Sequence, residues 1–261
     1  MNKKTKIILI IIGIGLIIYP ILSNVIYKIT QTTAITNYDA QIVTMNEEEK
    51  EEIKEEYKKY NEEILENASS EVDLLKVGEI IGYISIPKLD INLGIYEGTS
   101  KDVLQQGVGH LKNSSIPGEK STHCVLAGHS GLAKATLFDD IDKLVNGDIF
   151  SITILDNTYY YEVDQIKTVE KEDTKDLKII KNKEYVTLVT CVPRYINSHR
   201  LLVRGKRVKD NRQNYEIEEN ITTEEQKVET NNINQFVIIS LIIVNFFLLL
   251  IYLSIVLRKK P

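Results

Sequence analysis

Two long apolar segments without a charged side chain stand near the two ends of this 261-residue chain. The first covers residues 7–27 and the second covers residues 236–257, and aliphatic side chains dominate both. As a helix rising about 1.5 Å per residue, each segment would be roughly 30 Å long, the thickness of the hydrocarbon core of a bilayer. The sequence therefore predicts a transmembrane helix at each end, in segments 1–27 and 236–261.

Basic residues flank both apolar segments on their outer sides. Three lysines precede the first segment, and Arg258, Lys259 and Lys260 follow the second. Because cytoplasmic flanks carry an excess of Lys and Arg, we expect both termini in the cytoplasm and the chain between them outside the cell membrane. The alternative for the first segment is a cleaved signal peptide, but its length and the lack of a small-residue cleavage site favour a retained anchor.

The charge distribution excludes one class of partner. The net charge is −5, and because six basic residues lie at the two ends, the chain between them carries −11. Nucleic-acid recognition needs a clustered basic surface, so we expect no nucleic-acid partner.

The chain between the anchors changes character three times. Residues 28–78 are predicted to be an extracellular helical segment and a possible lid. The firmest helix is at 46–66, where Asn46 and Glu49 have the spacing of a capping box. An apolar stripe on one face of that helix consists of Ile53, Tyr57, Tyr60 and Ile64. Residues 209–235 are polar and acidic, which predicts a flexible stalk.

Residues 79–208 contain short runs rich in Ile, Val, Thr and Tyr, separated by turn residues. Two helical interruptions are expected, KDVLQQ at 101–106 and a longer helix at 135–144. Seven or eight short strands without regular strand–helix alternation predict a mostly β domain, a closed barrel or a sandwich.

Familiar ligand-binding motifs are absent from the sequence. It holds no phosphate-binding loop, no dinucleotide-binding glycine motif and no paired Cys or His zinc motif, so we expect neither a metal nor a cofactor.

Nucleophilic chemistry by a cysteine is the class of reaction that remains. Cys191 ends a strongly β-forming run, whereas Cys124 lies inside another run and is expected to be a buried apolar group. A disulfide between the two cysteines is the alternative, and the sequence leaves it open.

Two further side chains are candidates for the same site. His129 follows a predicted strand between small residues, although a lone histidine is more often structural than catalytic. Arg200 opens the last predicted strand nine residues after Cys191, so a tight return would bring its guanidinium beside the thiol, where it could bind an oxyanion. A surface salt bridge is the alternative role for Arg200.

These residues together resemble the sortase family, in particular the pilin-polymerising class C. The resemblance covers residues 79–208 and rests on TLVTC at 187–191, AGHS at 127–130 and HRLLVRG at 199–205. It extends to IPKL from Ile86, GVGHL from Gly107 and the DIDKL stretch from Asp140.

The resemblance implies an eight-stranded sortase-type β-barrel with short helices, and a cysteine transpeptidase. Cys191 would attack the Thr–Gly bond of a Leu-Pro-x-Thr-Gly-like sorting signal, Arg200 would stabilise the oxyanion, and His129 would exchange protons with the leaving and incoming amines. The implied partners are pilin or surface-protein substrates with a C-terminal sorting signal, and a lysine or peptidoglycan amine as nucleophile. Pilus assembly by a Gram-positive cell is the implied role.

The sequence departs from the class C pattern in two places. Residues 67–78 lack an Asp-Pro-aromatic lid element, and residues 192–196 lack the usual Thr-Pro-Tyr-Gly sequence, so no substrate-binding residue is assigned. Two alternative functions stay open: a housekeeping-type sortase that anchors surface proteins to peptidoglycan, and a non-catalytic, membrane-tethered adhesion module.

Overall fold

The structure is a computed structural model that describes residues 3–67, 69–70, 77–131 and 137–209. The chain divides into two compact units, and residues 26–211 form the larger one. Helix α1 (Lys3–Thr44) contains the first apolar segment, and helix α2 (Glu47–Asn67) follows it. Among the described residues, no helix combines the length and the apolar character needed to cross a membrane. The second apolar segment and most of the predicted stalk lie outside the described residues, so the two spans stay predictions.

Helix α2 begins as the sequence predicts. The Asn46 side chain accepts a hydrogen bond from the Glu49 amide at 2.9 Å, and the Glu49 carboxylate accepts one from the Asn46 amide at 2.9 Å. This reciprocal pair is a capping box, which satisfies two amides that a helix start leaves unbonded. Of the predicted stripe, Tyr57, Tyr60 and Ile64 are buried. Most charged side chains of α2 stay in solvent, but Lys50 and Lys54 form ion pairs with Asp156, in a turn between two strands, at 3.8 and 3.7 Å.

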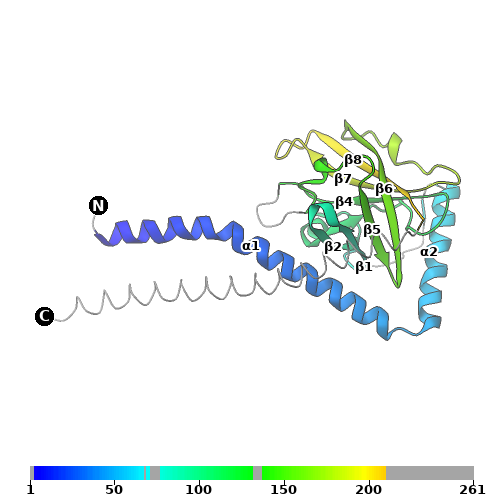
Figure 1. Cartoon of the computed structure of the whole chain (residues 1–261), viewed down its shortest axis with the longest axis horizontal. Helices are drawn as coiled ribbons and strands as arrows, with labels where there is room; N and C mark the ends of the chain where they lie inside the picture. The colour runs from blue at the N-terminus through cyan, green and yellow to red at the C-terminus, as the bar shows by residue number, and fades with distance from the viewer. Residues whose placement is uncertain (1–2, 68, 71–76, 132–136, 210–261) are drawn as a thin grey trace. The chain divides into compact units, whose positions relative to one another are not determined.

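Asn61 fastens α2 to the strand domain. Its amide group donates to the Ile116 carbonyl at 3.0 Å, and its amide oxygen accepts from the Ile116 N–H at 2.8 Å. One buried side chain thus satisfies both backbone groups of a residue in the loop between two strands. Figure 1 shows α2 beside the strands, and these bonds hold it there.

Eight strands close into one barrel, which confirms the expected fold. They are connected in the order β1-β2-β3-β4-β7-β8-β6-β5. Two neighbouring pairs are parallel, β2 with β3 and β4 with β7, and the other six pairs are antiparallel. The strands are β1 (Ile80–Ile86), β2 (Ile91–Glu97), β3 (Val108–His110), β4 (Thr122–Ala127), β5 (Ile149–Ile154), β6 (Asn157–Glu170), β7 (Glu184–Val192) and β8 (His199–Arg207). Helix α3 (Lys101–Gln106) lies between β2 and β3, where the sequence predicts it.

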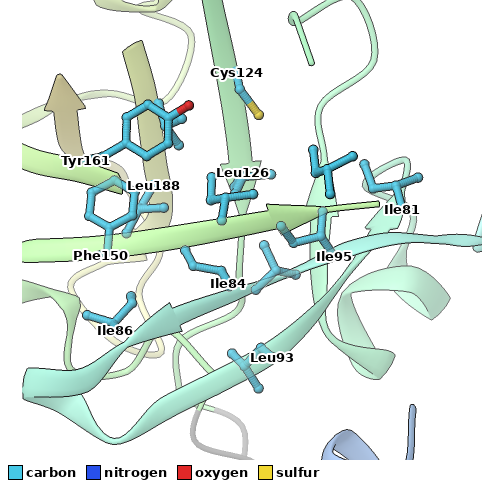
Figure 2. Packing of buried hydrophobic residues seen from close by; sticks show 14 of the residues in the cluster. Ile81, Ile84, Ile86, Leu93, Ile95, Cys124, Leu126, Phe150, Tyr161 and Leu188 are labelled. Atoms are coloured by element: carbon cyan, nitrogen blue, oxygen red, sulfur yellow. The ribbon is translucent and has the colours of Figure 1, made fainter. Parts of the chain in front are cut away.

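The interior of the barrel is aliphatic and aromatic. Figure 2 shows side chains from several strands meeting there, with the Cys124 thiol among them. Along β7, Val186 and Leu188 are fully buried in this core. Side chains alternate between the two faces of a strand, so Thr187, Val189 and Cys191 belong to the outer face.

The prediction of a helix at 135–144 is wrong for residues 137–144, the part that the structure describes. From Leu137 on, the segment contains only a single turn of 3₁₀ helix, η2 (Ile141–Lys143). The apolar spacing does report burial, because Leu137, Phe138, Ile141 and Leu144 are all in the core. The backbone, however, bonds elsewhere: the Phe138 amide donates to the carbonyl of His129 at 3.1 Å. Contact with another loop therefore replaces the bonds that would continue a helix.

Candidate active site

Cys191 and Arg200 face each other across two antiparallel strands. They are directly paired in the register of β7 and β8. Directly opposed residues of antiparallel strands have their Cβ atoms about 4.5–5.5 Å apart and point to the same face. Both side chains are partly exposed, so the thiol and the guanidinium share one accessible surface.

His129 reaches the same place through the parallel pairing of β4 with β7. The last paired residues are Ala127 and Val189. The Gly128 amide then donates to the Val189 carbonyl at 3.0 Å, so the two chains stay side by side beyond the strand end. Two residues past Ala127 in this register, His129 comes level with Cys191.

Two hydroxyl groups fasten the chain on either side of that histidine. Thr190, just before Cys191, donates from its Oγ1 to the Gly128 carbonyl at 2.8 Å. Ser130, just after His129, donates from its Oγ to the Cys191 carbonyl at 2.6 Å. One bond joins the two segments just before the His–Cys pair, and the other joins them just after it. Together they hold the backbone that carries the imidazole against the backbone that carries the thiol.

Cys124 lies apart from this centre, and both cysteines are free. Cys124 pairs with Val186, five residues before Cys191, which is about 16 Å along a strand at ~3.3 Å per residue. It also points into the core, whereas Cys191 points outward. Distance and direction both oppose the disulfide alternative. Burial keeps the Cys124 thiol protonated by raising its pKa far above the ordinary value.

The segment after His129 is supported by residues 138–139. The Asp139 carboxylate accepts a hydrogen bond from the Gly131 amide at 2.6 Å. The Phe138 ring lies against Gly128 so closely that a Cβ there would come within 2.5 Å of a ring carbon. Only glycine allows this approach, because any side chain at 128 would displace the ring.

The loop between β7 and β8, residues 193–198, closes the other side of the site. Arg200 donates from Nη1 to the carbonyls of Asn197 at 3.2 Å and His199 at 3.0 Å. Tyr195 and Asn197 have φ angles of +69° and +59°, a region that residues other than glycine rarely adopt. The loop therefore has an unfavourable backbone conformation, which hydrogen bonds from residues outside the loop must stabilise.

Burial sets the charge of the imidazole. Desolvation lowers the pKa of His129 below its ordinary value of 6.5, so the neutral ring predominates at neutral pH. The other three histidines have different surroundings. His110 is buried against Glu97 and His123 against Thr187, while His199 contacts Ser198 and Glu170.

The described ranges contain no group of three or more His, Cys, Asp or Glu side chains arranged to hold a metal ion. What the site does hold is a thiol on β7, a guanidinium on β8 and an imidazole on the segment just after β4. That set can perform acyl transfer through a thioester: a nucleophile, a proton carrier and an oxyanion donor are present.

Sequence reasoning selected Cys191, His129 and Arg200, and the structure brings the backbones of all three to one end of the sheet. It missed Thr190, Ser130 and Asp139. A hydroxyl residue beside each candidate was a visible signal for the first two. Nothing local marks Asp139, because its role depends on the path of the loop.

Comparisons with known proteins agree with this geometry. The Sortase domain family model matches residues 84–208. Among curated proteins, Sortase D of Bacillus subtilis is 35% identical over 136 residues, which are 51% of this chain and 66% of that protein, just under two thirds of its length. Sortase A of Listeria monocytogenes is 28% identical over 220 residues, 84% of this chain and 97% of that protein.

Solved structures are similar over the same region. Sortase C of Clostridium perfringens, determined with the C-terminal cell wall sorting motif, is 42% identical with a TM-score of 0.65, covering 69% of this chain and all of that one (100%). Sortase C1 of Streptococcus agalactiae is 44% identical with a TM-score of 0.63, and again 69% of this chain covers 100% of that chain.

Proposed function

The chain belongs to the sortase family of cysteine transpeptidases, and on that premise we propose that it cleaves a Leu-Pro-x-Thr-Gly-like sorting signal and joins the acyl fragment to an amine. The observation that carries the proposal is the direct pairing of Cys191 with Arg200, beside the His129 segment. The likeness to class C structures favours a pilin as substrate and a pilin lysine as the amine.

In the first half-reaction, the Cys191 sulfur attacks the threonyl carbonyl carbon while the thiol proton moves to His129. This proton transfer suits an imidazole that is neutral at rest, as the lowered pKa of His129 implies. The carbonyl oxygen becomes an oxyanion. Arg200 uses two contacts from one nitrogen in the resting site, and a guanidinium has five N–H donors, so others remain for the oxyanion.

Collapse of the tetrahedral intermediate breaks the Thr–Gly bond. His129 gives its proton to the departing glycine nitrogen, and the acyl group stays on Cys191 as a thioester. In the second half-reaction an amine attacks the thioester carbonyl and passes a proton to the imidazole. The new amide forms as the C–S bond breaks, and the thiol recovers its proton from His129.

Mass spectrometry tests the thioester directly. The full-length chain, purified in a mild detergent, is mixed with a sorting-signal peptide. We expect an adduct on Cys191 with the mass of the peptide less its glycine end, released by hydroxylamine. Cys191→Ala should form none, and Cys124→Ala is the matched control that should still form it. Turnover by Cys191→Ala would contradict the proposal.

The acceptor separates pilus assembly from the housekeeping alternative. With the thioester formed, a peptide that bears a lysine side chain and one that bears an N-terminal glycine are supplied in equal amounts. Preferential transfer to lysine supports pilin joining, whereas preference for the glycine amine favours attachment to peptidoglycan. In cells, normal surface polymers in a Cys191→Ala strain would instead favour a non-catalytic adhesion module.

We further propose that both termini face the cytoplasm and that the barrel lies outside the cell membrane, held by the apolar segments 7–27 and 236–257. A phosphatase that is active only outside the cytoplasm tests this topology when fused to the chain. Fusion within residues 209–235 should be active, and fusion after residue 261 should be inactive. The reverse pattern would contradict the topology.

A further inference from the structure

An arginine joins the two loops that carry the reacting groups. Arg194 lies in the loop after Cys191 and extends to the segment that follows His129. Its Nη2 donates to the carbonyl oxygen of Asp139 and to the Asp140 carboxylate, the latter at 3.0 Å. Lys143 and Arg194 together lower the pKa of Asp140, so this carboxylate stays charged across the neutral range.

Arg194 holds residues 139 and 140. The same segment, residues 138–140, supports the loop that contains His129. The Phe138 amide donates to the His129 carbonyl at 3.1 Å. The Asp139 carboxylate accepts from the Gly131 amide at 2.6 Å. A continuous path of bonds therefore runs from Arg194 through residues 138–140 to both sides of Ser130.

The loop that contains Arg194 gains little from burial. Tyr195 is 83% exposed and Ile196 is 72% exposed, and Tyr195 has a positive φ angle. Within the loop, the Ile196 and Asn197 amides donate to the Pro193 carbonyl. Outside bonds come from Arg200, which donates to the Asn197 carbonyl, and from Arg194. These two arginines hold the loop at opposite ends.

We propose that Arg194 is a positioning residue that holds the loop after Cys191 against the segment supporting His129, and so fixes the separation of the thiol and the imidazole. This role rests on the proposed function, in which the two groups exchange a proton. The Ser130–Cys191 bond is a second link between the same segments. Loss of Arg194 should therefore make the separation of the Cys191 thiol and the His129 imidazole more variable, while the Ser130–Cys191 bond keeps the two groups near each other.

Four variants test the role: Arg194→Gln, Arg194→Lys, Asp140→Asn and the double variant Arg194→Gln/Asp140→Asn. Lys143→Gln is the matched control, because Lys143 pairs with Asp140 at 2.9 Å and is not part of the loop. Two rates are measured on the full-length chain: peptide cleavage, as separate kcat and KM, and alkylation of Cys191 by iodoacetamide against pH. The melting temperature is recorded for each variant.

For Arg194→Gln we expect kcat to fall about tenfold with KM little changed, because a small misplacement of a reacting pair is costly. Arg194→Lys should lose less, since an ammonium keeps the charge without the planar fork. The double variant should lose less than the product of the two single losses. The melting temperature should barely move, because the Arg194 and Asp140 side chains are 41% and 34% exposed.

An unchanged kcat and an unchanged alkylation profile in Arg194→Gln would overturn the proposal, as would losses that multiply in the double variant. An equal loss in Lys143→Gln would also overturn it. Failure of the proposed function gives a different result, namely no cleavage by the wild-type chain. In that case the alkylation profiles still decide whether Arg194 positions the thiol.

Discussion

Side-chain bonds to backbone carbonyls hold the reacting residues in place. Thr190 bonds to Gly128 and Ser130 bonds to Cys191, so each hydroxyl reaches across from one catalytic segment to the other. Such bonds fix the backbones and leave the imidazole and the thiol able to react. Positioning and chemistry thus belong to different residues, although they are neighbours in sequence.

Replacing Thr190 with Val should test this division. The change keeps the shape of the side chain but leaves the buried Gly128 carbonyl without its donor, which costs about 1–3 kcal/mol. We expect that loss in the free energy of unfolding, measured in urea, and a lower kcat. Thr168→Val, on an exposed part of β6, should stay within about 0.5 kcal/mol of wild type. Equal stability of both variants would contradict the prediction.

His123 should make the stability of the fold depend on pH. Its Nδ1 faces the Lys178 carbonyl at 3.0 Å, so that nitrogen carries the proton, and Nε2 accepts from the Thr187 hydroxyl at 2.7 Å. Both bonds suit the neutral ring, and burial lowers the pKa of His123 below 6.5.

A lowered pKa in the folded state means that the unfolded chain binds more protons in the window below about pH 6.5. The free energy of unfolding should therefore fall as the pH drops from 6.5 to the folded-state pKa of His123. His129 adds a slope of the same sign. His123→Gln should flatten the profile of unfolding free energy against pH. An unchanged slope would show that His123 does not contribute to this pH dependence.

Among the elements, helix α2 is attached to the barrel by buried apolar side chains, by ion pairs to Asp156 and by a few hydrogen bonds. Besides the two Asn61 bonds, the Tyr60 hydroxyl accepts from the Asn113 amide at 3.1 Å. The helix start at Asn46 was predictable, because a capping box is a local pattern. The attachment was not, because Asn61 and Ile116 are 55 residues apart.

Asn61→Ala should loosen α2 without unfolding the barrel, because the apolar packing of Tyr57, Tyr60 and Ile64 remains. It leaves the N–H and the carbonyl of Ile116 unbonded in a buried place, which costs about 1–3 kcal/mol for an unsatisfied group. Hydrogen exchange should then become faster in residues 47–67 than in β7. Glu62→Ala, on the exposed face of the same helix, is the control and should leave exchange unchanged. Uniform acceleration throughout the domain would contradict separate attachment.

At the scale of the whole molecule, Tyr38 ties the part of helix α1 that belongs to the larger unit, residues 26–44, to the barrel. This side chain is 5% exposed. Its hydroxyl donates to the Ile81 carbonyl at 3.0 Å and accepts from the Leu155 amide at 2.7 Å. One hydroxyl thus connects a helix to β1 and to the turn between β5 and β6. Strands β1 and β5 are neighbours in the barrel.

Tyr38→Phe should lower the free energy of unfolding by about 1–3 kcal/mol, because two buried backbone groups lose their partner. The Leu155 amide should exchange faster with solvent. Tyr19→Phe, in the same helix but 62% exposed, is the control and should change neither quantity. A Leu155 amide that stays protected in Tyr38→Phe would show that the hydroxyl is not what holds it.

Local patterns in the sequence determined the strands, the start of α2 and the directions of the key side chains. Alternation along β7 and β8 turns Cys191 and Arg200 outward, and alternation along β4 turns Cys124 into the core, because side-chain direction in a strand depends only on position. Tertiary structure alone decided that β4 lies parallel to β7 and that Arg194 meets residues 139 and 140. Those pairings join segments more than fifty residues apart, and their register is set by the closed barrel, which no local pattern encodes.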